Sequence, residues 1–161
     1  MLNLADLVGE YDENFRILHL TAKKPIRCTT REHGYALAGA VKELLARHLQ
    51  GQRGYMITDY SKIIIEPLYV DEYANQIKDI VQTYLHPDGL ARYGYEITRV
   101  TAQLSHSLYL ASPPNLFNTR EEAYQYIRCL IARQKETAAN GEMPSQIGAS
   151  SASQPPSPSR Q

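Results

Sequence analysis

The chain has 161 residues, with 17 Lys and Arg against 17 Asp and Glu, so its formal net charge is zero. This length allows one well-packed core but is short for two ordinary domains. A neutral balance lacks the basic excess that draws proteins onto nucleic acid or anionic membranes, so neither partner is expected. No stretch reaches the roughly 20 apolar residues that span a bilayer, and Met1–Gly9 does not resemble a signal peptide. We therefore expect a cytoplasmic protein without membrane insertion.

The first two predicted elements are a strand and a helix. Residues 14–21 alternate with a period of two, which is typical of a strand. Glu32 follows Thr29 by three residues, the spacing of a capping box at a helix N-terminus. Apolar residues then recur at helical offsets until Gly51, which predicts an amphipathic helix.

Two apolar runs and the clearest helical pattern come next. Residues 54–60 are rich in strand formers and apolar on both faces, which favours a buried central strand, and residues 63–65 form a second apolar run. Pro67 suits the first turn of a helix. An apolar stripe of period 3.6 runs from Val70 to Leu85, and the turn-forming residues 86–89 are expected to end that helix.

The remaining pattern predicts a short strand at residues 92–95 and a final helix. Residues 97–108 suit a helix but could also be extended. After Leu116 and Phe117, Asn118 is the expected N-cap of the last helix, which is predicted to stop near Lys135.

Strands and helices alternate along the whole chain, which predicts an α/β fold with one sheet of about four strands and crossover helices. Residues 1–135 would form this single domain. Residues 136–161 are rich in Ser, Pro, Gln and Ala, with almost no large apolar side chain. Such a segment cannot bury enough surface to offset the entropy of ordering, so we expect a disordered tail.

Two local motifs carry a family resemblance. Residues 55–61, Tyr-Met-Ile-Thr-Asp-Tyr-Ser, look like a central strand ending in an Asp-x-Ser turn, and residues 116–123 look like a closing strand and capped helix. On these motifs the chain resembles the STAS domain (anti-sigma-factor antagonist) family, in its divergent branch of small stand-alone proteins, over residues 11–133. The resemblance implies a regulatory module that binds a kinase, a sigma-factor antagonist or another signalling protein.

In that family the switch is a phosphorylated Ser or Thr at the start of the helix after the central strand. This sequence departs from the pattern, because residues 66–69 read Glu-Pro-Leu-Tyr and contain no hydroxyl of that kind. The resemblance therefore implies that the usual switch is missing or moved, with Ser61 as the nearest candidate.

No pattern for a metal or a nucleotide cofactor is present in the sequence. The five histidines are scattered without metal-ligand spacing, and the two cysteines form no CxxC pair. We expect both cysteines to be reduced and Cys129 to lie on a core face. The glycines form no phosphate-binding motif. We therefore predict no cofactor, and no metal site, for this chain.

Two features of the sequence indicate a binding site. Polar residues gather where the central strand ends and the next helix begins, which is the edge at which α/β sheets usually place their sites. The chain also holds 12 Tyr against 2 Phe and no Trp. Tyrosine suits interfaces, although the same rings also suit core-edge positions with their hydroxyls in water. The predicted partner-binding residues are Asp59, Tyr60, Ser61, Glu66, Tyr69 and Tyr73.

These features predict a non-catalytic regulatory or scaffolding module that binds a protein partner, such as a kinase or another signalling protein, and that could also self-associate. The alternative is a small-molecule or lipid carrier with a tyrosine-lined pocket between the sheet and the helix over residues 69–85. A third hypothesis is an enzyme that uses Asp59 and Ser61 with a distant histidine, His19 or His106.

Overall fold

The computed structural model of the protein describes residues 2–94 and 115–141 and has an α/β fold. Five strands form the main sheet in the order β1-β2-β4-β6-β7, with β1 antiparallel to β2 and all other neighbours parallel. A separate parallel pair joins β3 to β5. The strands are β1 (Leu7–Asp12), β2 (Ile17–Ala22), β3 (Ile26–Cys28), β4 (Gly54–Asp59), β5 (Ile63–Ile65), β6 (Leu85–Tyr93) and β7 (Leu116–Phe117), preceded by the short helix η1 (Leu4–Asp6).

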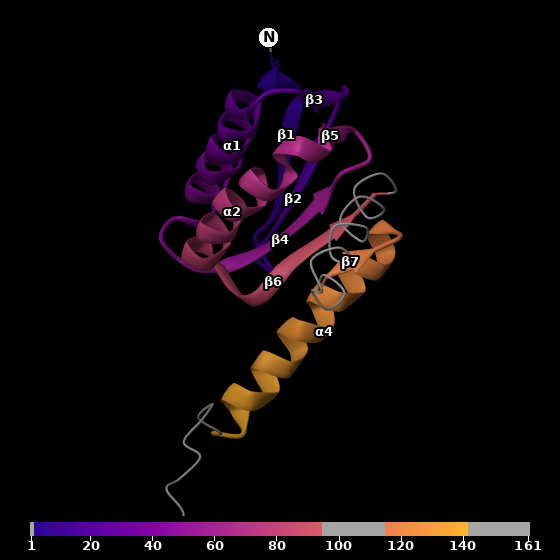
Figure 1. Cartoon of the computed structure of the whole chain (residues 1–161). Coiled ribbons are helices and arrows are strands. Elements are labelled where there is room, and N and C mark those ends of the chain that lie inside the picture. The colour runs from indigo at the N-terminus through magenta and orange to yellow at the C-terminus, as the bar shows by residue number, and fades with distance from the viewer. Residues whose placement is uncertain (1, 95–114, 142–161) are drawn as a thin grey trace, which may run out of the picture.

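Helices cover the two faces of the sheet unequally (Figure 1). Helices α1 (Arg31–Leu49) and α2 (Pro67–Tyr84) pack side by side on one face, whereas α4 (Arg120–Ala139) lies on the other. Helix α4 contacts mainly β6, β4 and β7 and extends beyond the sheet with its C-terminal half. The α4 face of the β1–β2 hairpin is therefore not covered by a helix within the described residues.

Alternating side chains divide the apolar residues between two cores. Leu18, Leu20 and Met56 point toward α1 and α2, while Ile17 and Ile57 point toward α4. Because neighbours in a strand face opposite sides, this split follows directly from the period-two pattern of β2 and β4. The same rule puts His19 on the α4 face, beside Ile17.

The predicted α/β class is confirmed, and so is the central strand, because β4 lies between β2 and β6 and five of its six residues are buried. The predicted number of strands was too low. The sequence analysis missed β1, which is an edge strand that is only partly buried. The strand predicted at residues 14–21 begins at Ile17, and Phe15 lies in the preceding turn, 37% exposed.

Both predicted helix caps are wrong by one residue. Thr30, not Thr29, caps α1 and accepts a hydrogen bond from the backbone N–H of His33 at 3.2 Å. Thr119, not Asn118, caps α4 in the same way. Adjacent residues with similar capping ability give the sequence no means of choosing between them.

Two further boundaries and the burial of one cysteine also differ from the prediction. Residues 86–89, expected to form a turn after the helix, lie within the bounds of β6, which starts directly after α2. They nevertheless interrupt its ladder with β4, because Gly54 pairs with Leu85 and Met56 with Leu90, and Asp88 has a φ of 60°. Helix α4 continues through Glu136 to Ala139, four residues past its predicted end. Cys129 is exposed rather than on a core face, while Cys28 is buried. The predictions for residues 97–108 and for most of the tail fall on positions 95–114 and 142–161, outside the described residues.

Candidate functional site

The loop after β4 holds the first group of predicted site residues. Asp59 ends the strand, and its Oδ1 atom accepts a hydrogen bond from the backbone N–H of Ser61 at 2.8 Å. This Asx turn leaves Ser61 exposed. Glu66 is the exposed N-cap residue of α2, but its side chain makes no capping hydrogen bond. Ser61 and Glu66 are thus accessible to a partner.

Two of the predicted residues belong to the core instead. Tyr60 is 3% exposed and Tyr73 is 6% exposed. Burial, together with the neighbouring Tyr60 hydroxyl and its hydrogen bond, raises the pKa of Tyr73 well above its usual value. Tyr60 lies in the β4–β5 loop and Tyr73 in α2, so the two buried rings pack the loop against the helix. Tyr69 is partly buried and packs against the same core.

An exposed surface that the sequence did not reveal lies beside this loop. Leu68, in the first turn of α2, is 79% exposed, and Tyr35 of α1 is 47% exposed. The Tyr35 hydroxyl donates to Glu72 Oε1 at 2.6 Å, and Glu72 Oε2 lies 3.0 Å from Arg31 Nε. Leu68 is one helical turn before Glu72 and shares its side of α2. We call Arg31, Tyr35, Leu68 and Glu72 the α1–α2 surface.

A buried polar cluster occupies the opposite, α4 face of the sheet. The Nε2 atom of His19 lies 2.8 Å from the hydroxyl of Tyr93, at the end of β6. Burial, and then the Asp59 carboxylate that hydrogen-bonds this hydroxyl, raise the pKa of Tyr93. The ring of Tyr124 from α4 meets His19 edge-on, with centroids 5.6 Å apart. Three strands and α4 therefore meet at one polar point.

Only one ring nitrogen of His19 has a hydrogen-bond partner among the described residues. Its Nε2 atom shares a hydrogen bond with the Tyr93 hydroxyl at 2.8 Å, in which the donor depends on the tautomer of the ring. Its Nδ1 atom is buried and has no hydrogen-bond partner there. Burial, and then the charge of Arg120, lower the pKa of His19 and favour its neutral form.

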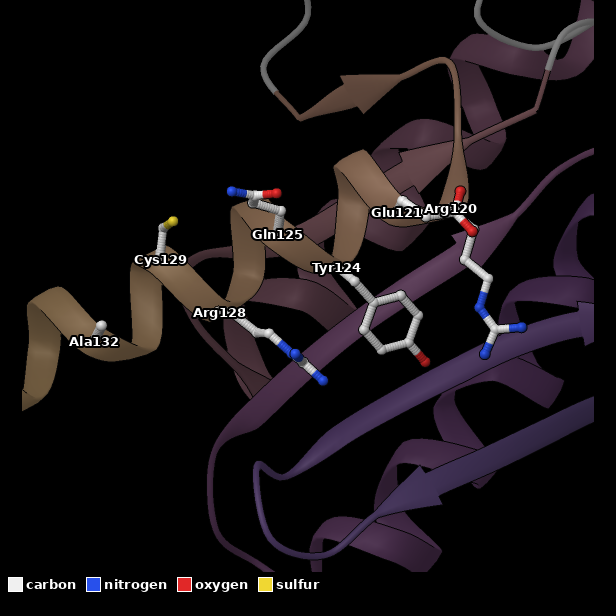
Figure 2. A pocket seen from close by; sticks show the side chains of 7 residues that line it. All are labelled: Arg120, Glu121, Tyr124, Gln125, Arg128, Cys129 and Ala132. Atoms are coloured by element: carbon white, nitrogen blue, oxygen red, sulfur yellow. The ribbon is translucent and has the colours of Figure 1, made fainter.

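A cleft of about 730 Å³ runs along α4 next to this cluster. Arg120, Tyr124 and Arg128 follow one another at every fourth position of the helix. Figure 2 shows them extending toward the strands, with the Tyr124 ring between the two guanidinium groups. We call this site the α4 cleft; its other described lining residues are Glu121, Gln125, Cys129 and Ala132.

Sequence patterns alone could not reveal the His19 cluster, since His19 and Tyr93 are 74 residues apart along the chain. Arg120, Tyr124 and Arg128 of the α4 cleft, in contrast, recur at every fourth position of one segment, a spacing that is visible in the sequence but does not by itself indicate a cleft. The one available signal was a histidine at an inward position of an otherwise apolar strand. The partners of such a histidine depend on strand order, which the sequence does not encode locally.

The enzyme hypothesis requires a histidine beside Ser61, and the described residues show no such pair. The polar contact of His19 is with Tyr93, not with Ser61. His106 lies outside the described residues. Within residues 2–94 and 115–141, no group of three or more His, Cys, Asp or Glu side chains is arranged to hold a metal ion.

Comparison of the sequence with protein-family models and with curated proteins gives no match. In the part of the chain that the structure describes, no helix is both long and apolar enough to cross a membrane.

Proposed function

We propose that the protein is a cytoplasmic, non-catalytic regulatory or scaffolding module of STAS-like build. It binds a protein partner through the α1–α2 surface and the adjoining Ser61 and Glu66. The observation that carries this proposal is the exposure of Leu68, 79% accessible at the start of α2. This helix follows the central strand, as the resemblance leads one to expect.

The composition of the α1–α2 surface supports a protein partner. An exposed leucine and tyrosine provide apolar area, while Arg31 and Glu72 form a charged edge around them. Protein interfaces have this anatomy of an apolar centre and a polar rim, and Tyr and Arg are frequent among residues that dominate binding energy. The Glu72 contacts also join α2 to α1 across this surface.

The carrier alternative expects a cavity between the sheet and α2. In that space Val70, Tyr73 and Ile77 are 7%, 6% and 2% exposed, so the helix packs closely there. We therefore favour the interaction module over a carrier that uses this face.

A site-specific photo-crosslinker tests the proposal in cells that naturally make the protein. It is placed at the exposed position 66, and the matched control is the exposed position 82 near the other end of α2. We expect a discrete crosslinked protein from position 66 only, and its loss when Leu68→Glu is added. Because Leu68 is largely exposed, that substitution should leave the circular dichroism spectrum unchanged.

Identical adducts from both positions, or an adduct that survives Leu68→Glu, would contradict the proposed surface. A small molecule retained by the purified protein in native mass spectrometry, with no crosslinked protein, would favour the carrier instead.

A further inference from the structure

The α4 cleft carries positive charge that the described residues do not neutralise by ion pairs. Within residues 2–94 and 115–141, the ion pair with an N···O distance of 4.0 Å or less is the one between Arg31 and Glu72, far from the cleft. The lining carboxylate Glu121 is the neighbour of Arg120 in α4, and the Glu10 carboxylate acts on Arg120 from β1, but neither carboxylate lies within 4.0 Å of a cleft guanidinium. Since the chain as a whole is neutral, this charge is a local feature.

Aromatic rings hold both guanidinium groups by their flat faces. The Cζ atom of Arg120 lies 5.2 Å from the centroid of the Tyr124 ring, and that of Arg128 lies 5.6 Å from the centroid of Phe15. A guanidinium stacked in this way keeps N–H donors along its edge, and that fork matches phosphate or carboxylate oxygens in pairs. The two arginines are thus oriented at low entropic cost for an oxyanion.

The surroundings of the cleft add a second observation. His19 is 2% exposed, lies against the Tyr124 ring, and its Nδ1 atom has no hydrogen-bond partner among the described residues. A buried polar atom without a partner is costly and recurs at functional sites. The volume of about 730 Å³ is in the range of small-molecule pockets, so the ligand has room for an organic group.

We propose that the α4 cleft binds a small organic diphosphate or phosphate ester, whose anionic groups are held by Arg120 and Arg128 on either side of Tyr124. Two separate cations favour a ligand with more than one negative charge. The site is on the opposite face of the sheet from the α1–α2 surface, so it does not depend on the proposed function.

Isothermal titration calorimetry of the full chain with sodium pyrophosphate, at constant ionic strength, tests the site. We expect saturable binding that Arg120→Gln and Arg128→Gln each weaken roughly tenfold, because each removes charge-assisted hydrogen bonds. Arg133→Gln is the matched control, since this exposed residue of α4 removes the same charge outside the described cleft lining. Its affinity should stay within about twofold of the unchanged protein.

No binding at concentrations up to about 10 mM, beyond the affinity of a weak specific site, would overturn the proposal. Equal weakening by Arg133→Gln would overturn it too, because the effect would then be non-specific. A parallel titration with citrate separates phosphate from carboxylate chemistry, and tighter binding of citrate would refute the phosphate assignment. Circular dichroism confirms that each variant is folded.

Discussion

His19 and Tyr93 are joined by a 2.8 Å hydrogen bond that bridges β2 and β6 across the central strand β4. Ile57 of β4 is in register with His19 and is buried beside it. The polar pair is buried as well, since His19 is 2% and Tyr93 9% exposed. The strength of this hydrogen bond and the protonation state of His19 should both affect the free energy of unfolding.

Tyr93→Phe should lower the free energy of unfolding by about 1–3 kcal/mol, because it leaves both ring nitrogens of buried His19 without a partner. The double variant His19→Leu, Tyr93→Phe removes both polar groups and should recover part of this loss. Urea denaturation of the two variants measures the difference. A double variant less stable than Tyr93→Phe would show that packing, not hydrogen bonding, dominates here.

Acid should destabilise the protein through His19. Burial, and then Arg120, hold its pKa in the folded state below the ordinary value of 6.5, so the unfolded chain binds more protons. The stabilisation is present above pH 6.5 and is lost as the pH falls through the lowered pKa. Urea denaturation at a series of pH values should give a shallower decline for His19→Gln.

The pKa of His86 is also lowered, first by burial and then by Arg53, so His86→Gln is the comparison variant. If the pH dependence is unchanged in His19→Gln and disappears in His86→Gln, the acid sensitivity belongs to His86.

Thr119→Ala should destabilise α4, because the Thr119 hydroxyl accepts the backbone N–H of Glu122 at 3.3 Å. Loss of such a cap costs about 1 kcal/mol. Asn118→Ala is the matched control and should cost less, since the described contact of Asn118 uses its backbone N–H, which donates to Glu122 Oε2 at 3.1 Å. Thermal unfolding measures the stability of the two variants. An equal or larger loss of stability for Asn118→Ala would show that Asn118 is the cap, as the sequence suggested.

These caps illustrate how far the sequence determines this fold. Periodicity identified α1, α2, α4 and β4, because their burial is regular and one-sided or complete. It missed β1, whose side chains are only partly buried at the sheet edge. Pro87 and Gly89 are usual in turns, and although β6 begins at Leu85, residues 86–89 form an irregular bulge in its ladder with β4.

The sequence predicted the place of the loop that holds the candidate residues better than the exposure of their side chains. The loop between β4 and α2 does end the central strand at the expected edge, yet Tyr60 and Tyr73 face inward. Tyrosine content cannot distinguish a core ring with a hydrogen-bonded hydroxyl from an interface ring. The exposure of Leu68 was not predicted, although this leucine lies outside the apolar stripe that begins at Val70.

The two cysteines should react at very different rates in the folded protein. Burial raises the pKa of the Cys28 thiol to about 11, so little thiolate forms near neutral pH, and the side chain is inaccessible. Cys129 is exposed on α4. Labelling with iodoacetamide, followed by intact mass, should add one group quickly and a second only in denaturant. Rapid double labelling without denaturant would mean that the α1–α2 core opens readily.

Gly94→Ala should destabilise the end of the sheet by about 1–3 kcal/mol. Gly94 has a φ of 121°, and an added Cβ would lie 2.7 Å from the backbone N of Ser61 and 2.9 Å from the carbonyl carbon of Tyr60. The substitution therefore forces the loop that carries Asp59 and Ser61 to move. Gly39→Ala is the control, because nothing lies within 4 Å of its added Cβ in α1.

At Gly39 the alanine lowers the entropy cost of helix formation, so the protein should gain about 0.5–1 kcal/mol. Urea denaturation of both variants gives the two free energies of unfolding. Opposite signs are expected because backbone conformation and space decide the outcome rather than residue type. A Gly94→Ala protein as stable as the parent would mean that the β4–β5 loop shifts freely, and the α1–α2 surface would then lack a rigid neighbour.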